Sequence, residues 1–380
     1  MIGPGPGAAR LASDLKVPVL GALLVTGFVR LLWSVQRACE VLQCDDFGRF
    51  WYATSAWRIH GTSLYALTPA SVADDGLVYT NLNLPHTHLL FVPFTWLGRD
   101  LAAAVWLLTG IASLAASLVV IHKESGWRPT WGWVAVFLWW MPTHVQAVTG
   151  QIAWILLLPM TLAWADARRN RWAYAGAWIG VAMAIKPFLA PVLVWLVWRR
   201  EWRAIGAALA ASAIVFAVGL VTFGVDSYAD WRHVVGGIDW YARPVNASMW
   251  GGVYRAFTVN PRFASVVDLG HGALWLTAIL GGIVAIATWG RCRQLRELDA
   301  EWTIVLTATL LICPLGWVYY GCLLLPGWRA RWPGILATAC WLVPTPWITA
   351  GQPSALATVL WGSTATWGLL LAWWHTMRTA

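Results

Sequence analysis

Two adjacent acidic residues stand a few positions after the first long apolar run. Asp45 and Asp46 open the stretch DDFGRFWYATSAWRIHGTSLY, which is rich in aromatic residues. A carboxylate in aromatic, partly dry surroundings can have a raised proton affinity, which suits it to take the proton of a hydroxyl group. The pair therefore predicts a general base, with Asp46 preferred and Asp45 as the second choice. A solvated acidic pair or a helix N-cap would give the same pattern.

A lysine ends the apolar run that precedes Pro187. Lys186 lies where two short apolar runs, 172–186 and 187–198, meet. An ionisable side chain costs about 2.5–3.5 kcal/mol at the centre of a membrane and is a functional candidate by default. Short or broken helices are also where membrane proteins build binding sites. We expect Lys186 to contact a phosphate group as a point charge, with snorkelling to the membrane interface as the alternative.

Polar residues elsewhere suit contacts with a sugar. His144 precedes Gly150-Gln151 by one and a half helical turns, and Gln151 is expected at an external turn. These side chains would present hydrogen-bond donors to a sugar, although a helix hairpin with a capping amide explains the pattern as well.

Two later stretches combine polar and aromatic residues. NASMWGGVYR contains Asn246, Ser248 and Arg255, and this composition suits carbohydrate or phosphate contact, or an ordinary polar loop. CPLGWVYYG contains Trp317, Tyr319 and Tyr320 at an expected external break.

Several common signatures are absent from the sequence. It has no GxxxxGK[ST], GxSxG, HExxH or GxGxxG after a strand, so nucleotide hydrolysis, serine-hydrolase and zinc-protease chemistry lack support. His86 and His88 lack an evident third ligand, so we predict no metal site and no cofactor, while a divalent-metal requirement is left open. A Cys39–Cys44 disulfide is likewise left open.

The composition is that of a polytopic membrane protein. Of 380 residues, 59% are hydrophobic and 11% charged, whereas soluble domains average about 25% charged residues. The net charge of +9 comes from short basic clusters between apolar stretches rather than from one basic face, so no nucleic-acid partner is expected. The 32 Trp residues suit membrane interfaces. Membrane lipids are therefore expected partners.

The apolar runs give the expected topology. About 20 apolar residues cross a bilayer, and twelve candidate helices follow: 17–35, 101–122, 131–149, 151–167, 172–186, 187–198, 204–224, 271–290, 301–316, 317–328, 332–349 and 357–376. The first is expected to be a retained signal anchor. Segment 85–98 is apolar but short and broken by Pro93, so we interpret it as interfacial or re-entrant. No internal repeat or linker is evident, so residues 1–380 are expected to form a single domain.

Charge sets the predicted orientation. With both termini in the cytoplasm, sixteen of the 26 basic residues fall on the inner side, mostly in short connections where the positive-inside rule applies. Two long loops, 36–100 and 225–270, then face outward and contain ten of the 17 acidic residues. An active site would therefore be extracytoplasmic.

These features together resemble the integral-membrane glycosyltransferases of the GT-C type. In particular, the chain is similar to glycosyltransferase family 87, the actinobacterial polyprenyl-phosphate-sugar-dependent mannosyltransferases and their arabinofuranosyltransferase relatives. The likeness covers most of the chain and rests on the following motifs: Asp46-Phe47 with Phe50, Ala53, Ala56, Gly61 and Leu64-Tyr65; Gly150-Gln151; GAWIGVAMAIKP ending at Lys186-Pro187; Asn246-x-Ser248 to Arg255; and Pro314-x-x-Trp317.

The resemblance implies an all-α, GT-C-like bundle in the cytoplasmic membrane. It also implies an inverting transfer to a cell-envelope glycolipid or glycan, most simply of mannose, from a polyprenyl-phosphate sugar. Asp46 would be the base, preferred over Asp45 by its spacing to Gly61, and Lys186 with Arg255 would contact the phosphate. Asn246, Ser248, Gln151, His144, Trp317, Tyr319 and Tyr320 complete the predicted donor site.

The chain departs from the family pattern at two places. The family commonly has Pro-Pro after the aromatic residue of the first loop, where this chain reads YTNLNLP, and it commonly has His shortly after the later Trp, where this chain has Tyr319 and Tyr320. The alternatives are an arabinofuranosyltransferase of the same fold, a transporter or flippase for a lipid-linked sugar, and a structural partner of another transferase.

Overall fold

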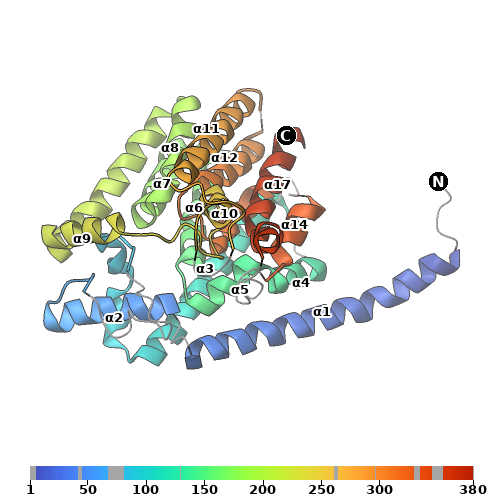
Figure 1. Cartoon of the computed structure of the whole chain (residues 1–380), viewed down its shortest axis with the longest axis horizontal. Coiled ribbons are helices and arrows are strands. Elements are labelled where there is room, and N and C mark those ends of the chain that lie inside the picture. The colour runs from blue at the N-terminus through green and yellow to red at the C-terminus, as the bar shows by residue number, and fades with distance from the viewer. Residues whose placement is uncertain are drawn as a thin grey trace.

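The computed structural model describes residues 6–41, 45–66, 81–128, 130–260, 264–295, 297–328, 334–344 and 354–379. Within these ranges the regular elements are all helices, and an isolated antiparallel β-bridge joins Asn246 and Trp317. The helices pack into a bundle, and α1 runs along one side of it with its N-terminal half projecting away (Figure 1). The all-α prediction is confirmed.

The elements follow the chain in this order: α1 (Pro6–Val41), α2 (Asp45–His60), η2 (Pro85–Leu90), η3 (Val92–Trp96), α3 (Arg99–Ser125), α4 (Trp131–Trp139), α5 (Met141–Thr149), α6 (Ala153–Arg168), α7 (Trp172–Ile185), η4 (Pro187–Leu189), α8 (Pro191–Trp198), α9 (Trp202–Gly236), α10 (Met249–Phe257), α11 (Gly272–Cys292), α12 (Leu298–Ile312), η5 (Val318–Leu324), α13 (Leu325–Trp328), α14 (Ile335–Leu342), α16 (Ala355–Leu360) and α17 (Thr364–Thr379). The symbol η marks 3₁₀ helices.

Four of the described helices are long and apolar enough to cross a membrane. They are the Lys16–Gln36 part of α1, α3, α9 and α11, and the chain is therefore a membrane protein. α9 contains a kink at Gly224, where φ is 76° and ψ is 164°. The predicted total of twelve crossings stays a prediction, and part of the run 332–349 lies outside the described residues.

Several of the predicted helices are broken or shorter than one crossing. The run 131–149 is divided at Trp140 into α4 and α5, and Pro142 in the first turn of α5 cannot donate to the preceding turn. The run 317–328 is mostly the 3₁₀ helix η5. Segment 85–98 forms η2 and η3 and contains no span-length helix, as expected.

A hairpin formed by α7, η4 and α8 presents Lys186 at its tip. The return of the chain is clear from Arg199, whose guanidinium lies 4.9 Å from the ring centroid of Trp172 at the start of α7. α7 has 14 residues, so it is about 21 Å long. That length is less than the roughly 30 Å of a bilayer core. α7 alone is therefore shorter than a full bilayer core, and the chain turns back at Lys186.

Small residues let α7 approach α9 closely. A Cβ atom added to Gly176 would lie 2.0 Å from the carbonyl oxygen of Ala204, and one added to Gly180 would lie 2.2 Å from that of Ala208. Ser212 Oγ also donates to the Gly180 carbonyl over 2.8 Å. Glycine and alanine four residues apart are typical of close helix contacts in membranes. This contact fixes α7, and with it Lys186, against α9.

At the base of the hairpin, buried acidic groups join three helices. Glu301 of α12 accepts hydrogen bonds from Trp195 Nε1 (3.0 Å) and Arg199 Nη1 (2.6 Å) of the α8 end. Asp299 accepts from Trp164 Nε1 over 2.9 Å and pairs with Arg168, both at the end of α6. These contacts anchor the end of the hairpin that lies opposite Lys186.

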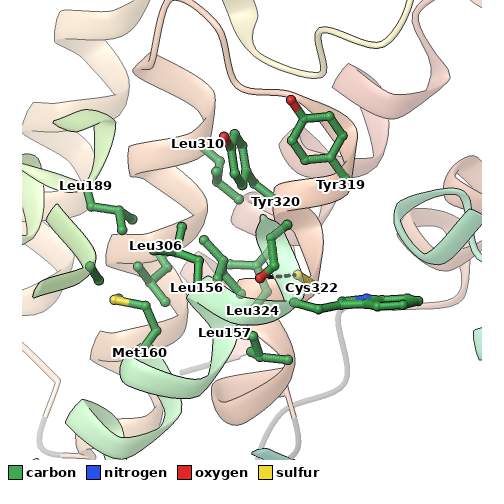
Figure 2. Packing of buried hydrophobic residues seen from close by; sticks show 14 of the residues in the cluster. Leu156, Leu157, Met160, Leu189, Leu306, Leu310, Tyr319, Tyr320, Cys322 and Leu324 are labelled. Atoms are coloured by element: carbon green, nitrogen blue, oxygen red, sulfur yellow. Dashed lines mark hydrogen bonds between the residues drawn. The ribbon is translucent and has the colours of Figure 1, made fainter. Parts of the chain in front are cut away.

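The centre of the bundle is an apolar core around η5. Figure 2 shows Tyr319 and Tyr320 projecting from η5 above a layer that contains Leu156 and Leu157 of α6. Cys322 Sγ is 3.6 Å from the carbonyl oxygen of Ala153 and donates to it. The core thus packs around η5 and fixes the segment that carries the two tyrosines.

We predict that Gly180→Ala lowers the thermal unfolding midpoint, because the new Cβ would overlap the Ala208 backbone. Overpacking of this kind costs about 1–3 kcal/mol. The matched control is Gly206→Ala in α9, where nothing lies within 4 Å of the added Cβ, and its midpoint should not fall. The measurement is thermal unfolding of the detergent-solubilised protein. Equal midpoints for both variants would contradict the close α7–α9 contact.

Candidate functional site

A cavity of about 140 Å³ opens between α2, the 81–88 segment, the α5–α6 turn, the hairpin tip and the 240–245 turn. Its lining residues are Asp46, Arg49, Phe50, Leu82, Asn83, Val145, Thr149, Gln151, Lys186, Trp240, Arg243, Val245, Trp317 and Tyr319. Five of the predicted site residues are among them (Asp46, Gln151, Lys186, Trp317 and Tyr319), from four separate parts of the chain. Among these described lining residues, Asp46 is the one carboxylate.

Asp46 lies in the first turn of α2 and is held by two neighbours. Its Oδ2 accepts a hydrogen bond of 2.6 Å from Gln151 Nε2, and its Oδ1 is 3.8 Å from Arg49 Nη1, one turn along the same helix. The Asp46 side chain is 23% exposed. The amide donor and the nearby guanidinium orient the carboxylate. Asp46 is therefore a partly shielded, oriented carboxylate.

The turn at Gly150 brings Gln151 to Asp46. Gly150 has φ of 63°, and a Cβ there would lie 2.7 Å from the Cβ of Phe47. Phe47 is buried and stacks on Trp106 at a centroid distance of 5.5 Å, and Trp106 Nε1 donates to the Gly150 carbonyl over 2.7 Å. Positive φ and the close Phe47 side chain both favour glycine. The Gly150-Gln151 motif thus positions the Asp46 carboxylate.

Lys186 lies at the end of α7 because a proline follows it. The residue before proline is pushed out of the α-helical region, and Lys186 has φ of −138° and ψ of 97°. Its Nζ donates to Asn83 Oδ1 over 2.6 Å and lies 6.0 Å from the ring centroid of Tyr320. The ammonium group therefore reaches the cavity while it keeps a polar partner.

The 85–88 segment caps the last carbonyl groups of α7. His86 Nε2 donates to the Ala184 carbonyl over 2.7 Å, and Thr87 Oγ1 donates to that of Ile185 over 3.1 Å. The final carbonyls of a helix have no partner within it. The carbonyls of Ala184 and Ile185 belong to buried residues and need donors from elsewhere in the chain. The 85–88 segment therefore packs against the end of α7, and this explains the burial of His86 and Thr87.

His88, in the same 85–88 segment, is uncharged. Thr54 Oγ1 donates to the Phe50 carbonyl, so His88 Nδ1 donates to Thr54 over 2.7 Å, and its Nε2 accepts from Asn81 Nδ2 over 2.5 Å. Burial, together with the positive charges of Lys186 and His86, lowers the pKa of His88 to about 3. His88 therefore links α2 to residues 81–83 through two hydrogen bonds as an uncharged side chain.

The opposite wall of the cavity is the 240–246 turn. Arg243 there lies with its guanidinium 5.5 Å from the ring centroid of Trp240. The bridge between Asn246 and Trp317 joins this turn to the start of η5, with Val318 N donating to the Val245 carbonyl over 2.8 Å. The bridge explains how Trp317 and Val245, far apart in the sequence, line one wall.

Arg255 supports that turn from behind. It is fully buried, and its Nη1 donates to the carbonyls of Arg243 (2.7 Å) and Asn246 (2.9 Å), while Nε and Nη2 donate to Ser363 (3.0 Å) and Thr366 (2.9 Å). Burial lowers the pKa of Arg255 to about 9, so the guanidinium stays charged at neutral pH. It fixes the cavity wall from outside the cavity.

The structure does not bring every predicted donor-site residue to the cavity. Arg255, Asn246 and Ser248 are buried within the fold: Asn246 Nδ2 donates to the Tyr241 and Pro314 carbonyls, both over 2.9 Å, and Ser248 caps α10. His144 and Tyr320 are also buried outside the lining. The expected direct contact of these five with the donor stays a prediction, since they lie outside the lining of this cavity. The Asp45 side chain and the Cys39–Cys44 pair lie outside the described side chains.

A scan against protein-family models matches residues 81–314 to "Glycosyltransferase family 87". The chain belongs to glycosyltransferase family 87. The predicted resemblance is therefore confirmed, and the protein is a glycosyltransferase. In this family 87 enzyme the matched range contains Gln151, Lys186 and Arg243, while Asp46 lies before it.

Curated relatives carry more specific names. A polyprenol-phosphate-mannose-dependent alpha-(1-2)-phosphatidylinositol mannoside mannosyltransferase of Mycobacterium tuberculosis is 27% identical over 333 residues, which are 77% of this chain and 75% of that protein. A phosphatidylinositol pentamannoside mannosyltransferase with the same donor dependence, from Mycolicibacterium smegmatis, is 24% identical over 250 residues, 64% of this chain and 58% of that protein. No solved structure matches the chain significantly.

Sequence reasoning missed several polar or aromatic lining residues of this family 87 enzyme, among them Arg49, Asn83, Trp240 and Arg243. Arg49 had a usable signal, because a residue three positions after Asp46 shares its helix face. The other three lie in irregular segments whose approach to Lys186 depends on tertiary packing. Within the described residues, no three His, Cys, Asp or Glu side chains gather to hold a metal ion.

We predict that Arg255→Met destabilises the protein more than Arg243→Met does, because Arg255 supports the cavity wall whereas Arg243 lines the cavity. Arg255→Met removes the donor of four hydrogen bonds, two to carbonyls and two to hydroxyls, so the free energy of unfolding should fall by about 2–5 kcal/mol. Arg243→Met changes a cavity-lining side chain and should cost less than about 1 kcal/mol. Thermal unfolding of both variants measures the difference. If Arg255→Met is as stable as Arg243→Met, the supporting role of Arg255 is wrong.

Proposed function

We propose that this family 87 enzyme transfers a mannosyl residue from polyprenyl-phosphate mannose to a hydroxyl group of a cell-envelope glycolipid. The observation that carries the proposal is the charge arrangement of the cavity, in which a single oriented carboxylate, Asp46, shares the space with Lys186, Arg49 and Arg243. The donor class is supported by the names of the curated relatives. Those names also support a phosphatidylinositol mannoside as the acceptor.

In the proposed reaction the acceptor oxygen attacks the anomeric carbon. Its proton passes to Asp46, the bond between that carbon and the phosphate oxygen breaks, and the electron pair leaves on the phosphate. The phosphodiester, with one negative charge, becomes a phosphomonoester with up to two. Cations already in place stabilise charge that develops in this way. Lys186 and Arg243 are placed to supply that stabilisation.

A single displacement that inverts the anomeric centre fits this set of groups. A double displacement needs a nucleophile in addition to an acid or base. Asp46 is the one carboxylate among the described lining residues, and Gln151 occupies its Oδ2. Asp46 therefore serves as the base, and no covalent enzyme intermediate is required. The proposed mechanism uses no cofactor.

We place the reaction on the outer face of the cytoplasmic membrane. Asp46 and Arg243 belong to the two long loops that the charge bias predicts to be outside, whereas Arg168, Arg169, Arg171 and Arg199 lie at the other end of the α7–α8 hairpin. Clusters of basic residues in short connections mark the cytoplasmic side. A lipid-phosphate donor needs no cytosolic nucleotide, which is compatible with an external site.

We predict that Asp46→Asn abolishes transfer while the protein still binds the donor. Loss of a general base lowers rates by about 10²- to 10⁴-fold, and the asparagine keeps the shape of the side chain. The assay is transfer of labelled mannose from polyprenyl-phosphate mannose to a glycolipid extract by purified protein in vesicles. The control is Asp100→Asn, an exposed residue paired with Arg99, which should transfer like the parent.

The same assay tests the alternatives. Polyprenyl-phosphate arabinofuranose, offered separately, should give no product; transfer of arabinofuranose alone would assign the enzyme to the related activity. A folded parent protein that transfers neither sugar, yet moves the lipid-linked sugar across the vesicle, would be a flippase. Full activity of Asp46→Asn would refute the base assignment.

A further inference from the structure

Asn83 is held rigidly at the cavity wall. Its side chain is 3% exposed, and its Oδ1 accepts the 2.6 Å hydrogen bond from Lys186 Nζ. Its backbone N–H donates to Asn81 Oδ1 over 3.1 Å, and its carbonyl accepts from the Tyr65 hydroxyl over 2.5 Å. Three contacts from three parts of the chain therefore fix the position of one amide.

The other half of this amide has no protein partner. Asn83 Nδ2 is buried and makes no hydrogen bond within the described residues. The orientation of the amide is settled by chemistry, because an ammonium group only donates and so requires the oxygen, not the nitrogen, to face Lys186. A buried donor without an acceptor destabilises a protein. The fold nevertheless keeps this donor on a residue that lines the cavity.

We propose that Asn83 Nδ2 donates a hydrogen bond to a phosphate oxygen of the lipid donor, beside the ammonium group of Lys186. The inference rests on the proposed function, since it takes the cavity's anion to be a lipid phosphate. Phosphate oxygens only accept hydrogen bonds, so one group satisfies both the orphaned N–H and the neighbouring cation. Asn83 is then a substrate contact and also an acceptor that holds Lys186 in place.

Asn83→Asp tests the contact with the phosphate. Aspartate keeps the shape and the oxygen that faces Lys186, but it removes both N–H donors and adds a negative charge facing the phosphate. The matched control is Asn170→Asp in the turn before α7, at the end opposite Lys186. Asn170 Oδ1 accepts from Trp172 Nε1 over 2.7 Å, and an aspartate there keeps that acceptor.

The binding experiment uses farnesyl phosphate and farnesol as probes of purified protein in vesicles, measured by calorimetry. The two probes share a short isoprenoid chain and differ in the phosphate. We expect Asn83→Asp to weaken farnesyl phosphate binding about 10- to 100-fold, as for a lost hydrogen bond to a charged group, and to leave farnesol unchanged. Asn170→Asp should bind both probes like the parent. Unchanged farnesyl phosphate binding by a folded Asn83→Asp would overturn the inference.

A second measurement covers the case in which Asn83→Asp does not fold. Asn83→Ser is compared in the parent and in Lys186→Met, as a double-mutant cycle. A direct contact weakens farnesyl phosphate binding in both backgrounds. If Asn83→Ser has no effect once Lys186 is gone, Asn83 acts only through Lys186 and the inference is overturned.

The test of the Asn83–phosphate contact and the test of mannosyl transfer can fail independently. A parent protein that binds farnesyl phosphate in an Asn83-dependent way but transfers no mannose refutes the proposed reaction and supports the phosphate contact. A parent that transfers mannose while Asn83→Asp binds farnesyl phosphate normally supports the reaction and overturns the contact. A parent that does not prefer farnesyl phosphate over farnesol also overturns the contact.

Discussion

The site depends on the break in the helix between Lys186 and Pro187. Proline ends α7 inside the protein and leaves its last carbonyl groups to be satisfied from elsewhere. His86 and Thr87 supply those hydrogen bonds, and this forces the preceding residues against the hairpin tip. Asn83 then meets Lys186. The break at Lys186-Pro187 therefore brings together the Lys186 ammonium, the Asn83 amide and the segment that contains Asn83. The close α7–α9 contact fixes the position of this group relative to α9.

The two remaining walls are positioned by different physical means. Asp46 is oriented by packing, because the Gly150 turn fits against Phe47 and delivers Gln151 to the carboxylate. The 240–246 turn is instead positioned by buried polar contacts, in which Arg255 gathers two backbone carbonyls. Buried hydrogen-bonded networks of this kind are rigid when every member is paired. Contacts outside the cavity therefore define the positions of the lining side chains, although these are few.

The sequence predicted the helical membrane class and the convergence of Asp46, Gln151 and Lys186, because apolar length and isolated charges are local properties. It could not tell a buried supporting residue from a ligand-binding residue. Arg255 and Asn246 have the residue types of a phosphate or sugar site, yet their partners are backbone carbonyls that only the tertiary fold brings near. Asn83 could not be recognised from the sequence either, because only the tertiary fold brings it near Lys186. The lengths of the broken helices likewise depend on packing around Pro142 and η5.

The tyrosines after Trp317 change how protons can move in this cavity. Where the family commonly has histidine, Tyr319 lines the cavity, and Tyr320 is buried with its ring centroid 4.4 Å from that of Phe188. A phenol ordinarily titrates near pH 10, whereas an imidazole titrates near neutrality. Among the described lining residues there is no histidine. In the proposed mechanism the proton therefore passes to Asp46, and Tyr319 at this wall has a hydroxyl group that can donate a hydrogen bond and a ring that can stack on a sugar.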